Sequence, residues 1–231
     1  MALQIVEVKN KSLEKFQNNL FEMSTNILRK DLEIKNFLWY EKLWQWADSY
    51  CISDEILPRN IVALLKLKSL DLSNLAISSI PKELYKLVSL KELSLYNNIL
   101  YTLPHGIGKL KHLKILELSK NCFKIFPEAL CELENLRKLD IRSNLLISIS
   151  SNIYKLKKLE YFDLFNNKLN NLPDEIAQLQ NLVEIDCLQN NLSKIPIAVK
   201  DLERLVKFRI KHNRIKKLPK ELISLKEIFI C

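Results

Sequence analysis

Residues 136–181 decide the fold: LRKLDIRSNLLISISSNIYKLKK is followed directly by LEYFDLFNNKLNNLPDEIAQLQN. When these two 23-residue lines are laid one above the other, their apolar columns coincide. Leu136 falls over Leu159, Ile141 over Leu164 and Leu156 over Leu179, and the polar Asn144 falls over Asn167. A fixed period of this length indicates a repeat architecture, which takes precedence over any local secondary-structure prediction.

The same unit extends along most of the chain without insertion or deletion. A half unit covers residues 57–66 and a partial unit begins at residue 228. Seven complete units start at Leu67, Leu90, Leu113, Leu136, Leu159, Leu182 and Leu205. Residues 1–56 do not show the period. The sequence therefore predicts two regions, a non-repeating one at 1–56 and a repeat array at 57–231.

Each half of the unit has its own period. The first eleven residues read LxxLxLxxNxL, and the alternation of positions four and six, as in Leu93 and Leu95, predicts a strand with one buried face. Stacked copies would form a parallel sheet with neighbours about 4.8 Å apart. The second half, LPxxIxxLxx, has apolar residues three apart after a turn-fixing proline, which predicts short helical or 3₁₀ segments. Unit four has Ser150 in place of the proline, so we expect a looser turn there.

Position nine carries an asparagine in six of the seven units. These residues are Asn98, Asn121, Asn144, Asn167, Asn190 and Asn213. A buried amide can both donate and accept hydrogen bonds, so each asparagine is predicted to satisfy backbone groups in its own and the adjacent turn. Unit one has Leu75 at this position, a departure that is expected at a capped end.

The region before the repeats has two candidate helices. In residues 12–30 an apolar stripe recurs at steps of three and four, formed by Leu13, Phe16, Leu20, Met23 and Ile27. Residues 37–50, FLWYEKLWQWADSY, hold all three tryptophans. These aromatics could present a partner-binding face or cover the open first turn of the array. We favour a helical N-terminal cap over residues 1–56, because a repeat array needs an atypical end unit.

Composition limits the class of protein. The hydrophobic share is 48% and the charged share 27%, which is typical of a soluble folded chain. No apolar run approaches the roughly 18 residues of a membrane span, and the start lacks the layout of a secretory signal. We therefore expect a cytoplasmic protein, with delivery to another cell by a different route left open. The five cysteines show no CxxC pair, so neither a disulfide framework nor a zinc site is indicated.

Charge is unevenly distributed along the chain. The net charge is +9, with −2 in residues 1–56, +11 in residues 57–231, and +6 in the last unit, 205–231. A basic end can attract an acidic protein, nucleic acid or anionic lipid.

The motif as a whole, for example LKELSLYNNILYTLPHGIGKLKH at residues 90–112, resembles the leucine-rich repeat family. Its 23-residue form is similar to the intracellular subclass found in Ras-associated scaffolds, plant intracellular repeat proteins and many bacterial proteins. The resemblance implies an α/β solenoid, with a curved parallel sheet on the concave face and short helical turns on the convex face. It also implies protein binding on the concave face, as an adaptor, scaffold or effector. A regulatory scaffold for a small GTPase or a phosphatase is a weaker alternative.

Partner contacts are expected at outward-facing strand positions, since the inward ones belong to the core. The predicted concave-face site comprises Tyr96, Glu117, Asp140, Arg142, Tyr161, Asp163, Phe165, Asp186, Leu188, Arg209 and Lys211. Its central column, position five, is acidic in five of seven units. That column could be an internally paired, solvated face or a site selected for a basic or mixed-charge partner. Tyr161, Phe165 and Leu188 form an apolar group that we place at the centre of the site.

Other functions find less support. The three histidines, His105, His112 and His212, lie in different units, and both glycines, Gly106 and Gly108, lie in one convex turn. We therefore expect no catalytic, cofactor or metal site and no enzymatic activity. The acidic column disfavours nucleic acid, although nucleic acid or anionic membrane bound to the basic last unit is kept as an alternative. Because unit eight has only begun at residue 231, dimerisation through that strand edge is a further alternative.

Overall fold

The computed structural model describes residues 39–223 and 229–230. Residues 42–231 form one compact unit. It begins with most of helix α3 (Trp39–Ser49), followed by the short helix α4 (Ile61–Lys66). The apolar stripe at residues 13–27 lies outside the described residues.

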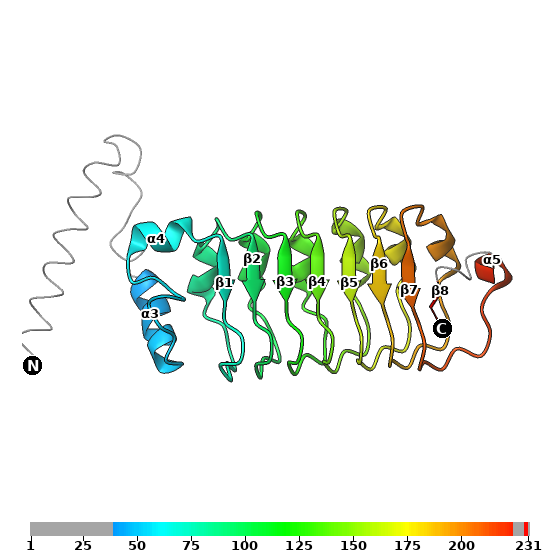
Figure 1. Cartoon of the computed structure of the whole chain (residues 1–231), viewed down its shortest axis with the longest axis horizontal. Helices are drawn as coiled ribbons and strands as arrows, with labels where there is room; N and C mark the ends of the chain where they lie inside the picture. The colour runs from blue at the N-terminus through cyan, green and yellow to red at the C-terminus, as the bar shows by residue number, and fades with distance from the viewer. Residues whose placement is uncertain (1–38, 224–228, 231) are drawn as a thin grey trace, which may run out of the picture. The chain divides into compact units, whose positions relative to one another are not determined.

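One eight-stranded parallel sheet runs through the whole array in the order β1 to β8 (Figure 1). Its strands are β1 (Ser69–Asp71), β2 (Glu92–Ser94), β3 (Ile115–Glu117), β4 (Lys138–Asp140), β5 (Tyr161–Asp163), β6 (Glu184–Asp186), β7 (Lys207–Arg209) and β8 (Phe229–Ile230). Between β7 and β8 the offset is 21, as Phe208 pairs with Phe229, so the eighth unit departs from the register expected of a start at residue 228. From β1 to β7, each residue pairs with the one 23 positions later, as Leu116 pairs with Leu139. The period read from the sequence is therefore the strand register itself, and the parallel sheet is confirmed.

A short helical turn returns the chain on the other face of the sheet in every unit (Figure 1). Six of these turns are 3₁₀ helices: η1 (Lys82–Lys86), η2 (His105–Lys109), η3 (Glu128–Glu132), η4 (Ser151–Lys155), η5 (Asp174–Gln178) and η6 (Ile197–Asp201). The seventh is a turn of α-helix, α5 (Lys220–Ile223). The predicted architecture of strands on one face and short helical turns on the other is confirmed.

The expected looser turn at Ser150 was wrong. Ser150 has φ −62° and ψ 141°, close to the −68° and 147° of Pro173 at the same position of the next unit. Its hydroxyl accepts a hydrogen bond from the backbone N–H of Asn152 at 3.0 Å. Ser150 therefore replaces the restricted φ of proline with a side-chain cap, and η4 keeps the five-residue length of its neighbours.

The core lies between the sheet and the helical turns and is built from the apolar columns. Leu136, Leu139, Ile141 and Leu146 of unit four are fully buried. Each such side chain contributes roughly 2 kcal/mol through burial. Cys187 is fully buried in the column of Ile141, and this burial raises the pKa of its thiol well above the usual value.

The asparagine column forms a continuous hydrogen-bond ladder. The Asn144 side-chain amide donates to the carbonyls of Leu118 and Ile141, both at 3.0 Å, and its Oδ1 accepts from the Phe123 N–H at 3.1 Å. Asn98, Asn121, Asn167, Asn190 and Asn213 repeat this arrangement. The prediction that each asparagine serves its own and the preceding turn is confirmed.

The residue before the ladder position adopts a left-handed conformation in every unit. These residues are Asn74, Asn97, Lys120, Ser143, Asn166, Gln189 and His212, with φ between 52° and 61°. No glycine occupies these positions, although this backbone region disfavours most side chains. The left-handed residue turns the chain inward at the end of each strand, which brings the asparagine amide into the interior.

Aromatic side chains of α3 contact the first turn of the array. The indole N–H of Trp44 donates to the Pro58 carbonyl at 3.1 Å, and that of Trp46 to the Ser79 carbonyl at 3.0 Å. The Tyr50 hydroxyl lies 3.0 Å from the Ser78 hydroxyl. These bonds support the capping interpretation for the end of α3. The division of the chain at residue 56 stays a prediction.

The ladder predicts a steep loss of stability when one amide is removed. In Asn144→Ala the buried Phe123 N–H loses its acceptor. The carbonyls of Leu118 and Ile141 each lose one of two amide donors and keep the bond from a neighbouring asparagine. The free energy of unfolding should therefore fall by about 2 kcal/mol. Chemical denaturation followed by circular dichroism measures this change. Asn171→Ala, at an exposed position of the next unit, is the matched control and should change stability by less than about 0.5 kcal/mol. Equal losses in the two variants would contradict the ladder's role.

Candidate functional site

The concave face is the outer face of the sheet, formed by positions three, five and seven of each unit. Because the strands are in register, every position forms a column across neighbouring strands about 4.8 Å apart. The residues that the sequence predicted for this face lie on it, spread over units two to seven. Their exposure and partners differ strongly from one column to the next.

The acidic column at position five is mostly committed to the fold. Asp140 is 5% exposed and Asp186 is 7% exposed. Each accepts a hydrogen bond from the backbone N–H two residues later, with Arg142 donating to Asp140 at 3.1 Å and Leu188 donating to Asp186 at 2.9 Å. Asp71 and Asp163 make the same bond to Ser73 and Phe165. The short acidic side chain thus closes the turn at the end of each strand.

The sequence predicted only exposure for position five, although it also carries a signal for this turn-closing role. Aspartate and serine accept hydrogen bonds from the backbone two residues on, and five of the seven units carry one of them at position five. Ser94 follows the same pattern with the Tyr96 N–H, at 3.5 Å.

Neighbouring basic side chains neutralise the acidic column. Arg142 contacts Asp140 at 3.4 Å and Asp163 at 3.6 Å. Arg209 contacts Asp186 at 2.7 Å and Glu184 at 2.9 Å. Lys138 pairs with Glu117, and Lys207 with Glu184, both at 3.3 Å. Of the two alternatives left open by the sequence, an internally paired face describes these charges better.

The middle carboxylate of the column is the most perturbed. Burial raises the pKa of Asp163 to about 6, against the opposing effect of the Phe165 N–H, and the neighbouring carboxylates Asp140 and Asp186 raise it further. Burial likewise raises the pKa of Asp140. Keeping three carboxylates in one column is therefore unfavourable, even with Arg142 beside them.

The apolar group has two parts rather than one. Phe165 and Leu188 follow β5 and β6 and are half-buried, in the same column of adjacent units. Tyr161 lies at the start of β5, is 45% exposed, and has Lys138 and Glu184 as its register partners. Phe165 lies four positions after Tyr161, about 13 Å along the strand direction, and Asp163 lies between them. Tyr96, in unit two, is half-buried and has the Lys120 ammonium 5.1 Å from its ring centroid.

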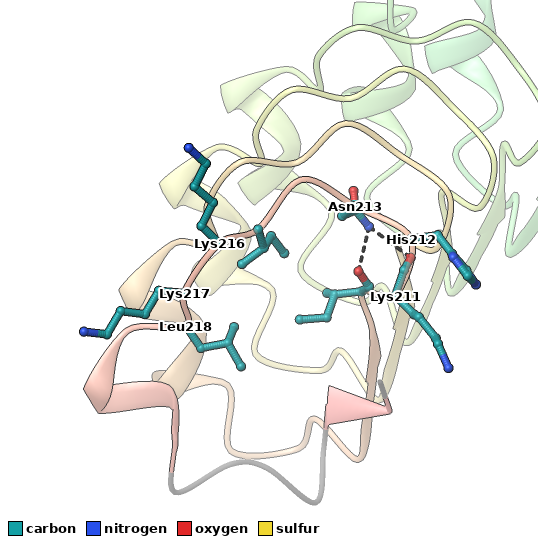
Figure 2. Close-up of a pocket in the computed structure, with 8 residues that line it drawn as sticks. Lys211, His212, Asn213, Lys216, Lys217 and Leu218 are labelled. Atoms are coloured by element: carbon teal, nitrogen blue, oxygen red, sulfur yellow. Dashed lines mark hydrogen bonds between the residues drawn. The ribbon is translucent and has the colours of Figure 1, made fainter.

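The C-terminal end of the face carries the remaining predicted residues. Arg209 is held in its ion pairs, whereas Lys211 is exposed. A hollow of about 300 Å³ lies beside Lys211, lined by residues 210–213 and 215–218. Figure 2 shows the side chains of Lys211 and His212 leaving it on one side and those of Lys216 and Lys217 on the other. The charged groups therefore do not converge on a ligand there.

Within the described residues, no group of three or more His, Cys, Asp or Glu side chains is arranged to hold a metal ion. No helix in this part of the chain is long and apolar enough to cross a bilayer.

The pKa of Asp163 predicts a pH-dependent effect of its replacement. A folded-state pKa of about 6 exceeds the unfolded value of about 3.9, so the native state binds the proton first and stability falls as pH rises through this window. Asp163→Asn keeps an acceptor for the Phe165 N–H and removes the charge. It should raise the free energy of unfolding at pH 7.5 by up to about 3 kcal/mol, with the gain vanishing near pH 4.

Denaturation at both pH values checks this expectation. Asp174→Asn, which removes an exposed carboxylate from the convex side, controls for the change in net charge. A destabilised Asp163→Asn protein at pH 7.5 would show that the carboxylate's contacts outweigh its burial.

Comparison with known proteins agrees with this geometry. The family model described as "Leucine-rich repeat region" matches residues 49–146, and "Leucine Rich Repeat" matches residues 158–179. No curated protein sequence matches the chain. A leucine-rich repeat protein of Leptospira interrogans has a similar structure, with 31% identity and a TM-score of 0.68 over 75% of this chain and 50% of that one.

Two other solved structures share the fold. An internalin from Listeria monocytogenes matches with 23% identity and a TM-score of 0.63, over 74% of this chain and 50% of its own. A plant peptide hormone receptor, solved in complex with its peptide, matches with 25% identity and a TM-score of 0.55, over 71% of this chain and 32% of its own. The chain spans about half the length of the two bacterial proteins. With its 23-residue register, asparagine ladder and these matches, the chain belongs to the leucine-rich repeat family.

Proposed function

We propose that the repeat array binds a protein partner on its concave face and acts as an adaptor, scaffold or effector rather than as an enzyme. The observation that carries the proposal is the set of side chains that the fold does not use. Tyr161, Phe165 and Leu188 are exposed or half-buried on a rigid sheet whose charges are already paired. Tyrosine, other aromatics and arginine are enriched at the centre of protein interfaces.

Arg142 is held in a fixed position on this face, which favours recognition of one partner over general attraction of acidic proteins. Its guanidinium is fixed by Asp140 and Asp163 while its side chain stays 47% exposed, so little further ordering is needed when a partner binds. A partner segment that contacts Arg142 would also reach Tyr161 on the next strand and Phe165 just after that strand. The predicted role of the remaining site residues is part of this proposal.

The pairing of charges also favours protein over nucleic acid at this site. Lys207 and Arg209 are the basic residues of β7, and both are bound to Glu184 or Asp186. A phosphate backbone would have to displace these carboxylates. Cys51, Cys122, Cys131 and Cys187 are free thiols, which supports the cytoplasmic residence included in the proposal.

Substitution of the apolar group tests the proposal. A partner captured by the wild-type chain should bind the Tyr161→Ala, Phe165→Ala, Leu188→Ala triple variant at least tenfold more weakly, because hot-spot side chains each account for more than about 1 kcal/mol. Isothermal calorimetry with the purified partner measures the loss, and thermal denaturation measures any effect on folding.

Ile197→Ala is the matched control, since Ile197 is an exposed apolar residue of η6 on the convex side. The proposal fails if the triple variant binds as tightly as wild type, or if both variants lose the same affinity. A large fall in melting temperature for the triple variant would mean that these side chains belong to the core.

A further inference from the structure

The loops that leave the strands form one continuous edge of the array, which we call the strand-exit edge. It comprises positions eight to fourteen of the seven units: residues 74–80, 97–103, 120–126, 143–149, 166–172, 189–195 and 212–218. Figure 1 shows these loops in a row along the lower edge of the sheet. Backbone bonds join each loop to the next, such as Cys122 N–H to Leu100 O at 2.7 Å and Leu145 N–H to Phe123 O at 2.9 Å.

The strand-exit edge carries positive charge only. Its seven loops contain seven lysine or arginine residues and no aspartate or glutamate. The basic residues are Lys120, Lys124, Lys168, Lys194, Arg214, Lys216 and Lys217, and all of them are exposed. Among the described residues, none of these seven forms an ion pair within 4.0 Å, in contrast to Arg142, Lys207 and Arg209 on the concave face.

The opposite edge, where the chain enters the strands, carries charges of both signs. It also holds lysines, but acidic residues are interspersed among them, such as Glu132 and Glu134. Arg137 on that edge pairs with Glu160. Charge alone therefore distinguishes the two edges of the same solenoid.

Large apolar side chains project from the same strand-exit edge in units two to four. Ile125 is 81% exposed, Tyr101 65%, Ile147 54%, Ile99 52% and Leu145 38%. They come from three consecutive loops and lie beside Lys120 and Lys124. Isolated exposed apolar residues are common, but a contiguous group indicates an interaction surface. In unit one the equivalent loop is hydrogen-bonded to Trp46 of α3 through Ser79 and to Tyr50 through Ser78, so the open part begins at unit two.

We propose that the strand-exit edge docks on the surface of a bilayer that contains anionic lipid. Lysine and arginine would lie among the head groups, and Ile125, Ile147 and Tyr101 would enter the boundary with the acyl chains. The row of loop tips suits an extended surface, because Ile125, Tyr101 and Ile147 are each more than half exposed. Branched aliphatic side chains offer little to nucleic acid, whose bases stack on aromatic rings.

This inference does not depend on the proposed function. The concave face is a different surface from the loop edge, so its side chains remain available when the edge is docked. Phe165 and Tyr161 are not on the strand-exit edge, and their substitution should leave lipid binding unchanged.

Vesicle cosedimentation with the full chain tests the inference. Wild type should bind vesicles of phosphatidylcholine mixed with phosphatidylglycerol and should not bind phosphatidylcholine alone. A triple variant, Lys124→Gln, Lys168→Gln, Lys194→Gln, should bind roughly a hundredfold more weakly, at about fivefold for each lysine. The matched control is Lys91→Gln, Lys114→Gln, Lys157→Gln, which removes the same charge from the opposite edge and should retain near wild-type binding.

A second pair of variants tests insertion. In the Ile125→Trp variant, brominated acyl chains in anionic vesicles should quench the fluorescence of the introduced tryptophan. In Val206→Trp, whose site is exposed on the opposite edge, they should not quench it. The inference is overturned if wild type ignores anionic vesicles or if both lysine variants weaken equally. It is also overturned if Ile125→Ser, Ile147→Ser binds vesicles like wild type, or if duplex DNA or polyglutamate binds more tightly than the vesicles do.

Discussion

Each buried asparagine amide has to find hydrogen-bond partners on two consecutive turns, and the rest of the array depends on this requirement. Asn144 reaches Leu118 and Phe123 in the preceding turn only because the two units have the same length. An inserted or deleted residue would move the amide out of reach and leave both the amide and the buried Phe123 N–H without a partner, at roughly 1–3 kcal/mol each. The ladder thus selects for a constant period, and a constant period keeps the strands in register.

A strict register has a consequence for the exposed surface, because it turns every outward position into a column. Like charges then stand about 4.8 Å apart unless neighbouring columns compensate. In this chain the compensation comes from Arg142 and Arg209, each of which contacts two carboxylates. Position five therefore closes the strand end and is neutralised from its flanks. Fewer concave residues are free for a partner than the alternating strand pattern alone would indicate.

The sequence was sufficient for the sheet, the helical turns and the ladder, since each depends on residue types that recur every 23 positions. It was insufficient where two residue types give the same turn, and where the burial of a side chain depends on its neighbours. Ser150 shows the first case, because a hydroxyl cap and a proline give the same turn. Asp140 shows the second, because its burial depends on Arg142 and on the strands beside it. Ile125 and Ile147 were missed because they occupy variable columns, which an analysis based on the repeat leaves aside.

The distribution of ion pairs separates two kinds of attraction. On the concave face the charges cancel within about 4 Å, so their field decays over a short distance and contacts there depend on shape and on side chains such as Phe165. On the strand-exit edge seven cations have no acidic neighbour on that edge, so their fields add along the row of loops. One solenoid can therefore orient itself by its edge toward an anionic surface while its sheet discriminates among partners. The asparagine ladder makes this division possible, because it fixes the backbone without using either surface.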